Sequence, residues 1–230
     1  FVFLHADDAV LAGRAEGLPA VTYGTEGQGY DVEGSVVACN PFLRLRWRVK
    51  DGAWHEVQTM LIGDYNLPNV LAACAVGCHF GVPESAVSAA LEAYRPTNSR
   101  SEFRTTAHNR LVVDAYNANV SSMHAALGNF AAIHDEGKMM ILGEMRELGE
   151  ASASAHSEIA DHAARTGIVA LWLVGKAFSH VVPEGFDGEL RHFPDVTAVK
   201  DWLREHPVGG RLILVKGSNG TRLFELPECL

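Results

Sequence analysis

The stretch that decides the fold of the second half of the chain runs from residue 138 to residue 174 and is KMMILGEMRELGEASASAHSEIADHAARTGIVALWLV. It begins with the apolar run Lys138–Leu142 and ends with a second apolar run, Ile168–Val174. Between them, Ser154–Thr166 has the spacing of an amphipathic helix, and Gly167 suits the position that ends it. Two nearly continuous apolar strands that flank a helix predict a parallel sheet with both faces covered.

The same alternation continues on both sides of this stretch. A strand is expected at Leu111–Ala115, followed by a helix at Ser121–Ile133 with serines at its start as caps. Downstream we expect a short strand at Arg191–Phe193, a helix at Thr197–His206 and a last strand at Arg211–Lys216. This half is therefore predicted to be an α/β domain with a Rossmann-like, mainly parallel sheet.

The first half has a different pattern, in which strands come first and helices follow. Apolar runs predict strands at Leu18–Gly24, Val32–Cys39, Leu43–Val49 and Trp54–Met60, and helices begin near Asn66 and Pro83. In the third strand, arginines 44, 46 and 48 alternate with apolar residues, as in a half-buried antiparallel strand. These arginines either form a basic binding face or, as we favour, a solvated strand face opposite acidic neighbours.

A polar segment hostile to helix, Arg95–Arg100, separates the two patterns and is the best candidate for a domain boundary. We therefore predict one domain at residues 1–99 and a second at residues 100–230. The chain begins with Phe1 and has no charged segment typical of a signal peptide, which indicates a sequence cut from a longer polypeptide.

The composition excludes several classes of protein. Of the 230 residues, 47% are hydrophobic and 20% charged, which rules out a disordered or fibrous chain. The net charge of −9 argues against a nucleic-acid partner, and no apolar run reaches the ~20 residues of a membrane span. The four cysteines show neither a Cys-x-x-Cys pair nor a disulfide rhythm, which favours a reducing compartment.

Several common motifs are missing from the sequence. There is no G-x-G-x-x-G after a strand, no G-x-x-x-x-G-K-[ST], and no H-E-x-x-H or G-x-S-x-G. Cys74 and Cys78 lie four apart on one helical face and are expected to be small core residues. His156 and His162 are expected to be surface or capping residues rather than metal ligands.

Three segments carry chemistry. Asn66 and Asn69 lie three apart at the start of a helix, so both amides share one face, and an amide can pair with the N6 and N7 edge of adenine. The alternative is that Asn66 is only an N-cap. Asp114 ends the first parallel strand, at the edge where open α/β sheets bind ligands, and its carboxylate can accept from two ribose hydroxyls.

Close to Asp114, the side chains of Asn117 and Asn119 add uncharged hydrogen-bonding groups, with a helix-capping turn before Ser121 as the alternative. The third segment, Lys216-Gly217-Ser218, follows the last strand. A lysine beside a glycine can reach a phosphate or a carboxylate without crowding.

These segments resemble motifs of the Mur ligases, ATP-dependent amide-forming enzymes of peptidoglycan precursor synthesis. The stretch Gly63–Asn69 resembles G-x-H-N-x-x-N with Tyr65 in place of the usual histidine, and Ala6-Asp7-Asp8 resembles the end of N-A-D-D. Three stretches resemble the branch that adds D-alanyl-D-alanine to UDP-N-acetylmuramoyl-tripeptide: Asp114–Asn119 (D-x-Y-N-A-N-P, with Val120 for proline), Leu142–Gly149 (L-G-D-M-x-E-L-G, with Glu144 for aspartate) and Val215–Ser218 (V-K-G-S). Arg100 matches the family's arginine before the last domain.

The resemblance implies a fold and a set of roles. Residues 1–99 resemble the second half of the family's central ATPase domain, a mixed sheet with helices, and residues 100–230 resemble its complete C-terminal domain. It implies catalytic roles for Arg100, at the phosphates or the hinge, and for Lys216, at the acyl phosphate. Asn66 and Asn69 would bind adenine or its surroundings and Asp114 the ribose, while Asn117, Asn119, Lys216 and Ser218 are candidates for substrate contacts.

The implied reaction transfers the γ-phosphate of ATP to the tripeptide carboxylate, and the D-Ala-D-Ala amine then attacks the acyl phosphate. Implied cofactors are ATP and Mg²⁺, with the magnesium ligands in a region upstream of residue 1; no metal ligand is expected in this chain. We expect a cytoplasmic monomer with no nucleic-acid or membrane partner, and a 230-residue chain that is inactive alone. The alternatives are a non-catalytic Rossmann-like module that binds a small ligand, and a ligase of the folylpolyglutamate synthase type.

Overall fold

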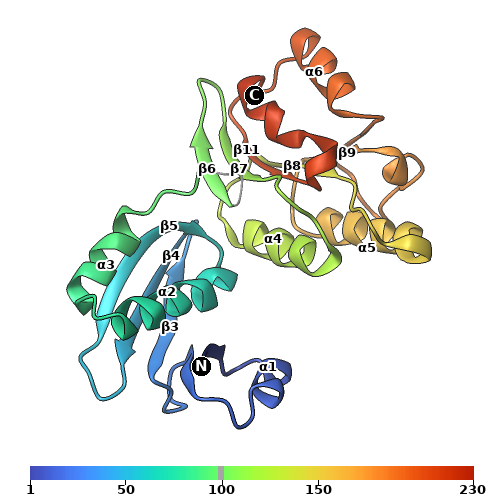
Figure 1. Cartoon of the computed structure of the whole chain (residues 1–230). Coiled ribbons are helices and arrows are strands. Elements are labelled where there is room, and N and C mark those ends of the chain that lie inside the picture. The colour runs from blue at the N-terminus through green and yellow to red at the C-terminus, as the bar shows by residue number, and fades with distance from the viewer. Residues whose placement is uncertain (98–100) are drawn as a thin grey trace. The chain divides into compact units, whose positions relative to one another are not determined.

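The computed structural model describes residues 1–97 and 101–230. The chain divides into two compact units, Phe1–Arg95 and Pro96–Leu230, each of which has its own sheet (Figure 1). Arg100, for which we predict a catalytic role, lies outside the described residues.

Within the described residues 1–97, the sheet holds five strands in the order β1-β2-β3-β4-β5. The strands β1, β2 and β3 pair in parallel, whereas β3, β4 and β5 pair antiparallel, so the predicted mixed sheet is confirmed. Their bounds are β1 Val2–His5, β2 Ala20–Thr25, β3 Val32–Cys39, β4 Phe42–Val49 and β5 His55–Ile62. The helices are α1 Ala9–Arg14, α2 Leu67–His79 and α3 Glu84–Ala93.

The alternation in β4 divides its side chains between the core and the solvent. Leu43, Leu45 and Trp47 are fully buried against α2, where Cys74 belongs to the same core. The arginines between them face acidic side chains, in the pairs Arg44–Glu56 (3.4 Å), Arg46–Glu26 (2.7 Å) and Arg48–Glu33 (3.1 Å). The solvated, ion-paired face that we favoured over a basic binding face is therefore the one observed, and Cys74 is a core residue as predicted.

The second unit holds a sheet in the order β10-β9-β8-β11-β7-β6, counted over the described residues. All neighbours pair in parallel except β6, which runs antiparallel to β7 at the edge. The bounds are β6 Glu102–Thr105, β7 Arg110–Asp114, β8 Lys138–Gly143, β9 Ala170–Val174, β10 Glu189–Phe193 and β11 Leu212–Lys216. The predicted mainly parallel sheet is confirmed, and β6 is an addition that its single apolar residue, Phe103, did not reveal.

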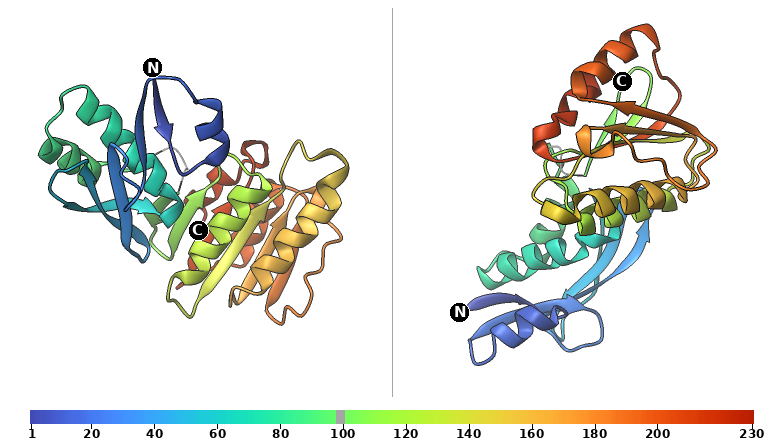
Figure 2. Two further views of the ribbon diagram at one scale, coloured as in Figure 1. Left: turned by 90° about the horizontal axis from the view of Figure 1, so that it is seen from below. Right: turned by 90° about the vertical axis from the view of Figure 1, so that its right-hand side faces the viewer.

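Helices cover both faces of this second sheet (Figure 2). Helices α4 (Val120–Ala132) and α5 (Ser152–Ala164) lie on one face, and α6 (Val196–Glu205) lies with the C-terminal segment on the other (Figures 1 and 2). Five short 3-10 segments complete the described chain: η1 Asp64–Asn66, η2 Gly149–Ala151, η3 Lys176–Phe178, η4 Asn219–Thr221 and η5 Leu223–Glu228.

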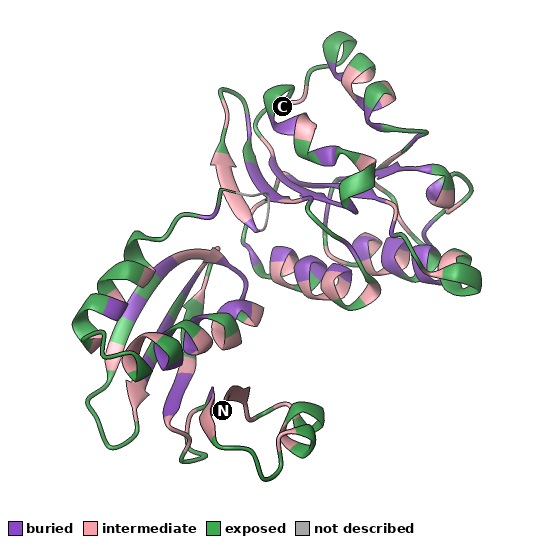
Figure 3. Cartoon of the chain, in the orientation of Figure 1, coloured by how far each residue is buried: buried purple, intermediate pink, exposed green. Residues whose placement is uncertain are grey.

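Burial follows this layering, because the central strands β8, β9 and β11 are buried along their whole length (Figure 3). On one face of the sheet, alternate side chains of these strands form one core with α6 and the C-terminal segment. Gly167, with a φ of +71°, follows α5 in the left-handed conformation that favours glycine after a helix. Among the described residues, no helix is both long and apolar enough to cross a membrane.

Candidate functional site

The carboxyl edge of the second sheet collects the chemistry that the sequence singled out. In the parallel register, Lys216 of β11 lies opposite Asp114 of β7 on one side and Leu142 of β8 on the other. Three loops therefore leave this edge side by side, one after each of these strands. Open α/β sheets bind their ligands at such an edge.

A buried ion pair joins Lys216 to Asp114. The Lys216 side chain is 1% exposed, and its Nζ contacts Oδ2 of Asp114, which is itself only 18% exposed. The backbone N–H of Ser101 donates to the other carboxylate oxygen at 3.3 Å. Because a buried charge is costly unless it is paired, each of these side chains holds the other in place. Both are predicted site residues, and the structure brings them into direct contact.

Glycines allow β8 and β11 to end in close contact beside this pair. A Cβ on Gly217 would lie 2.9 Å from the Cα of Gly143 and 2.8 Å from Oγ1 of Thr221. A Cβ on Gly143 would meet the same Thr221 hydroxyl at 2.7 Å. Real Cβ atoms do not approach other atoms so closely, so the edge requires glycine at both positions.

Ser218 lies next to this contact and is 3% exposed. Its backbone N–H donates to Glu144, and its carbonyl accepts from Thr221. Its buried hydroxyl, however, finds no hydrogen-bond partner among the described residues. A buried polar group without a partner costs free energy, and a ligand or a water can supply the missing bond. Ser218 was predicted to contact substrate, and this orphaned hydroxyl is consistent with that prediction.

A cavity of about 550 Å³ opens at the same edge, at the ends of β8, β9 and β10 and the start of α6. Its charged lining residues carry both signs: the carboxylates Glu144 and Asp195, and the cations Arg146, Lys176 and Arg222. The size is typical of a small-molecule site, and walls of both signs suit a ligand that carries both charges.

Local contacts fix the side chains that line the cavity. Glu144 lies over Gly175, which has a φ of +116°, and accepts from the N–H of Ala177 at 3.2 Å. Asp195 is the N-cap of α6 and accepts from Ala198 at 3.0 Å.

Arg146 lies over the other side of the cavity, on Gly220. Its guanidinium donates to the carbonyl of Gly220 at 3.3 Å and occupies the space that a side chain at position 220 would need. A side chain at position 220 would therefore displace the Arg146 guanidinium, and glycine leaves room for it.

A buried histidine supports the loop that carries Glu144 and Arg146. His156 of α5 is fully buried, with Nε2 accepting from the N–H of Met145 at 2.9 Å and Nδ1 contacting the carbonyl of Ser152 at 2.6 Å. The expectation that His156 lies at the surface or caps a helix is wrong, because its helix turns this face toward the sheet. His162, six residues later, is only partly buried and pairs with His124 (Nδ1 to Nδ1, 2.7 Å).

The two asparagines after β7 are exposed, and one of them caps α4. Asn119 is the N-cap, with Oδ1 accepting from the N–H of Ser122 at 2.8 Å, and the Ser122 hydroxyl accepts in return from the N–H of Asn119. The capping alternative is thus observed for Asn119, whereas Ser121 and Ser122 are not themselves the N-cap. Oδ1 of Asn117 accepts from the neighbouring Ala118. Their contacts with a ligand stay a prediction.

In the unit Phe1–Arg95, Asn66 and Asn69 lie together at the start of α2. Buried Asn66 donates to the carbonyl of Ile62 at 2.8 Å, and its Oδ1 accepts from Nδ2 of exposed Asn69 at 3.1 Å. No side-chain cap bond from Asn66 is found, so the N-cap alternative is wrong for its side chain. Buried Asn66 instead orients the exposed amide of Asn69. That this pair contacts adenine stays a prediction.

The sequence reasoning missed the role of the cavity residues. Glu144 and Arg146 stood within a recognised motif without an assigned role, and Lys176, Asp195 and Arg222 were not considered. The position of these residues in the sequence could have revealed them. Each follows the end of a predicted parallel strand, and the carboxyl ends of such strands meet at one edge of the sheet, where ligands bind.

The parallel sheet, its covered faces and its ligand-type carboxyl edge define the class of α/β domains that bind small molecules at the ends of their strands. Residues 99–219 match the family model of the Mur ligase glutamate ligase domain. The chain belongs to the Mur ligase family.

Its curated relatives include the UDP-N-acetylmuramoyl-tripeptide--D-alanyl-D-alanine ligases of Treponema pallidum and Mycobacterium leprae. The first is 31% identical over 183 residues, which are 78% of this chain and 39% of the relative. The second is 30% identical over 264 aligned residues, which cover 100% of this chain and 51% of the relative. The chain therefore spans about half of these relatives, or less. These relatives do not favour the folylpolyglutamate synthase alternative.

Solved structures show the same fold. A crystal structure of MurF from Acinetobacter baumannii matches with a TM-score of 0.85 at 22% identity, covering 99% of this chain and 51% of that chain. MurF ligase from Thermotoga maritima in complex with ADP matches with a TM-score of 0.78 at 18% identity, covering 99% and 52%. Both units of this chain thus have counterparts in Mur ligases.

Proposed function

We propose that this chain is the ATP- and D-Ala-D-Ala-handling part of a ligase that adds D-alanyl-D-alanine to UDP-N-acetylmuramoyl-tripeptide. The observation that supports it most strongly is the carboxyl edge of the second sheet. There a cavity with walls of both charge signs lies beside an orphaned buried hydroxyl and a buried ion pair. A free dipeptide carries an ammonium and a carboxylate, and the cavity offers Glu144 and Asp195 for the first and arginines and a lysine for the second.

The residues for ATP in this proposal are hydrogen-bonding groups that the structure holds rigid. The exposed amide of Asn69, oriented by Asn66, suits a base edge, and the carboxylate of Asp114, held by Lys216, suits the ribose hydroxyls. Arg100 is assigned to the phosphates or the hinge. Among the described residues, no three His, Cys, Asp or Glu side chains cluster closely enough to hold a metal ion.

The proposed chemistry proceeds in two steps that conserve every atom. The tripeptide carboxylate attacks the γ-phosphorus of ATP and releases ADP, which gives an acyl phosphate. The D-Ala-D-Ala amine then attacks the acyl carbon, loses a proton, and expels inorganic phosphate as the amide forms. Both steps depend mainly on positioning and charge neutralisation, and exclusion of water protects the acyl phosphate.

Within this scheme Lys216 acts on the reaction mainly through Asp114. Its ammonium is committed to the carboxylate and is almost fully buried, so it fixes the direction in which Asp114 presents its oxygens. Asn117 and Asn119 remain candidates for nucleotide or dipeptide contacts on the exposed turn after β7.

Ser218→Ala tests the proposal in the full-length protein that contains this chain. Because the buried Ser218 hydroxyl has no partner in the described chain, its removal should not lower the unfolding midpoint and should raise it slightly. If the hydroxyl binds the dipeptide, the KM for D-Ala-D-Ala should rise about tenfold in an assay of phosphate release. The matched control is Ser154→Ala, an exposed serine of α5.

Two results would contradict the proposal. If the wild-type protein released no phosphate from ATP in the presence of both substrates, the proposed ligase function would be wrong. If the KM for D-Ala-D-Ala were equal in Ser218→Ala and Ser154→Ala, the assignment of the dipeptide to this edge of the sheet would be wrong.

A further inference from the structure

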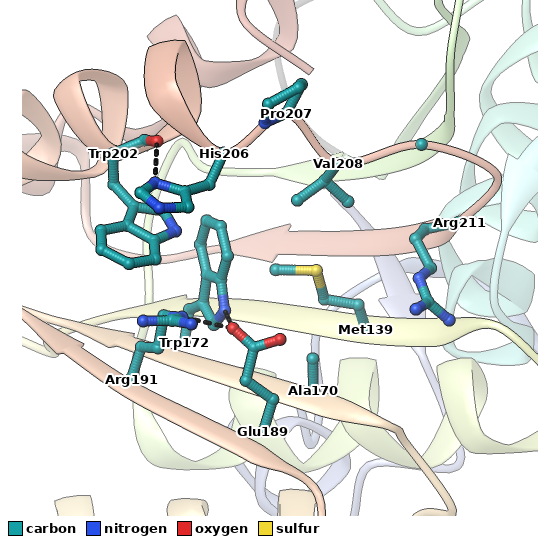
Figure 4. A pocket seen from close by; sticks show the side chains of 11 residues that line it. Met139, Ala170, Trp172, Glu189, Arg191, Trp202, His206, Pro207, Val208 and Arg211 are labelled. Atoms are coloured by element: carbon teal, nitrogen blue, oxygen red, sulfur yellow. Dashed lines mark hydrogen bonds and ion pairs between the residues drawn. The ribbon is translucent and has the colours of Figure 1, made fainter.

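A second cavity lies at the opposite, amino edge of the same sheet (Figure 4). Its volume is about 320 Å³, and it is formed by the starts of β8, β9 and β10, the end of α6 and the loop that leads into β11. Neither the proposed chemistry nor the family motifs use any residue of this cavity, so it calls for an explanation of its own.

The floor of the cavity is apolar and the wall is aromatic. Met139, Ala170 and Trp172 form the floor, and each is at most 5% exposed. On the wall, the imidazole of His206 stacks on the indole of Trp202, with ring centroids 3.8 Å apart and planes 7° from parallel. Such surfaces favour a flat, unsaturated ligand over a flexible aliphatic one, because aromatic faces stack efficiently.

Two of the charged groups at the rim already neutralise each other. Glu189 pairs with Arg191 on the edge strand β10 and also accepts from Nε1 of Trp172 at 3.4 Å. The Arg191 guanidinium lies 3.9 Å from the Trp202 ring centroid. Glu189 therefore stays in place as a hydrogen-bond acceptor at this end of the cavity, and its charge is compensated by Arg191.

Arg211 supplies the remaining charge at the other end of the cavity (Figure 4). Its backbone is fixed, because its N–H donates to Oδ1 of Asn109 at 3.1 Å and its carbonyl accepts from Arg110 at 2.9 Å. Its side chain lies against Gly137. None of the ion pairs among the described residues includes Arg211.

We propose that this amino-edge cavity binds a compact aromatic monocarboxylate that carries a hydrogen-bond donor opposite its acid group. The carboxylate would pair with Arg211, the ring would lie between the apolar floor and the His206–Trp202 stack, and the donor would face Glu189. The volume admits one such molecule at the small end of ligand sites. A phosphate dianion fits less well, since a single uncommitted guanidinium faces it.

The test uses 4-hydroxyphenylacetate as the probe and the full-length protein. Trp172 and Trp202 line the cavity, so binding should change tryptophan fluorescence in a saturable way, with a Kd of about 1 mM or tighter that calorimetry should reproduce. The neutral amide of the same molecule keeps the ring and the hydroxyl but loses the charge. It should bind about tenfold more weakly, because the charge-assisted bond to Arg211 is lost.

Arg211→Gln should weaken the acid by about tenfold and leave the amide unchanged. The matched control is Arg204→Gln, which removes the same charge from an exposed arginine of α6 that pairs with Asp201 outside the cavity. This control should bind the acid as the wild type does. Circular dichroism of each variant confirms that the fold is retained.

Three outcomes would overturn the proposal. One is no saturation of the wild type at about 10 mM acid. Another is equal affinity for acid and amide, which would exclude the carboxylate as the determinant and needs no variant at all. The third is an equal effect of Arg211→Gln and Arg204→Gln, which would reduce the contribution of Arg211 to general electrostatics. The ligase assay described above does not enter these outcomes, so the two proposals fail separately.

Discussion

Strand β7 carries an ion pair at each of its ends, and the two pairs differ in the burial of the cation. At its start, Arg110 pairs with Asp135 at 2.5 Å, and the arginine side chain is 52% exposed. At its end, Asp114 pairs with Lys216, whose side chain is 1% exposed. The two carboxylates are both largely buried, at 12% exposed for Asp135 and 18% for Asp114, so the difference lies in the cation, which faces water at the amino edge and not at the carboxyl edge.

The burial of the cation determines how much desolvation free energy each pair must offset. A pair in water contributes little, typically about 0–1 kcal/mol. A buried pair must offset a desolvation cost of several kcal/mol, and an apolar replacement of both partners is often neutral or stabilising. We infer that the carboxyl-edge pair, in which both side chains are largely buried, is retained for the orientation it gives to Asp114, whereas in the amino-edge pair a half-exposed arginine covers a largely buried carboxylate.

Removal of Lys216 should have the largest effect. Lys216→Met leaves the Asp114 carboxylate without its partner in a mostly buried site, so we expect a loss of about 3 kcal/mol in the free energy of unfolding, measured by urea titration. Arg110→Gln is the control and should cost less than Lys216→Met, because Arg110 is half exposed and Asp135 keeps its hydrogen bond from the Gly137 N–H.

A double variant sharpens this comparison. Lys216→Met combined with Asp114→Leu should cost less than Lys216→Met alone, because no unpaired charge remains. Equal losses for Lys216→Met and Arg110→Gln would show that burial does not distinguish the two ends of β7.

A glycine at each edge tests the packing next. Gly217→Ala brings a Cβ to 2.9 Å from Gly143 on the neighbouring strand, so we expect a loss of about 2 kcal/mol by thermal or urea unfolding. Gly209→Ala, at the amino edge, meets nothing closer than 3.9 Å and should change stability by less than about 0.5 kcal/mol. If Gly217→Ala were as stable as Gly209→Ala, the ends of β8 and β11 would be able to move apart and make room for the added Cβ.

Two histidines of one helix should differ in a smaller but measurable way. His156→Leu removes the acceptor of the buried Met145 N–H in the loop that lines the carboxyl-edge cavity, at an expected cost of about 1.5 kcal/mol. His162→Leu removes only a partly exposed contact with His124 and should cost less than about 1 kcal/mol. Urea unfolding of both variants measures the difference, and the reverse order would contradict the support assigned to His156.

The smallest effect concerns pH at the amino edge. Partial burial raises the pKa of Asp135, but hydrogen bonds from the Gly137 N–H and from Arg110 outweigh it and hold the pKa below the usual 3.8. Since the folded pKa is the lower one, Asp135 stabilises the fold above pH 3.8 and loses this contribution as the pH falls through its folded pKa. Arg110→Gln should move the midpoint of the Asp135 carboxyl titration, followed by NMR, upward toward 3.8. An unchanged midpoint would leave the Gly137 hydrogen bond and the charge of Lys138 as the causes of the lowered pKa.

Much of this fold follows from hydrophobic periodicity alone. Long apolar runs such as Lys138–Leu142 can be satisfied only in the middle of a covered sheet, and β8 lies there. Strand β6 escaped prediction because a four-residue edge strand needs few apolar side chains, whereas β1 is apolar and was missed because it is short and depends on pairing with a neighbour. The helical period of α5 places His156 on the same face as Ile159, Ala160 and Ala163, so its burial was predictable from the sequence.

The sequence predicted the individual residues of the candidate site but not the contact between Asp114 and Lys216. That Asp114 and Lys216 each lie at a strand end follows from the sequence. That they touch depends on the insertion of the last strand, β11, between β7 and β8, which no local signal encodes. The cavities were missed for the same reason, because their lining residues come from several segments that only the strand order brings together.

Helix α6 borders both cavities, with Asp195, Val196 and Thr197 at one end and Trp202 and His206 at the other. Helix α6 has ten residues and is about 15 Å long, so a single element contributes to the walls of both cavities. Coupling between the two cavities could run through this helix. Thermodynamic linkage makes such coupling reciprocal. If a ligand in the amino-edge cavity changes the affinity of the carboxyl-edge cavity for its ligand by some factor, the carboxyl-edge ligand changes the affinity of the amino-edge cavity by the same factor.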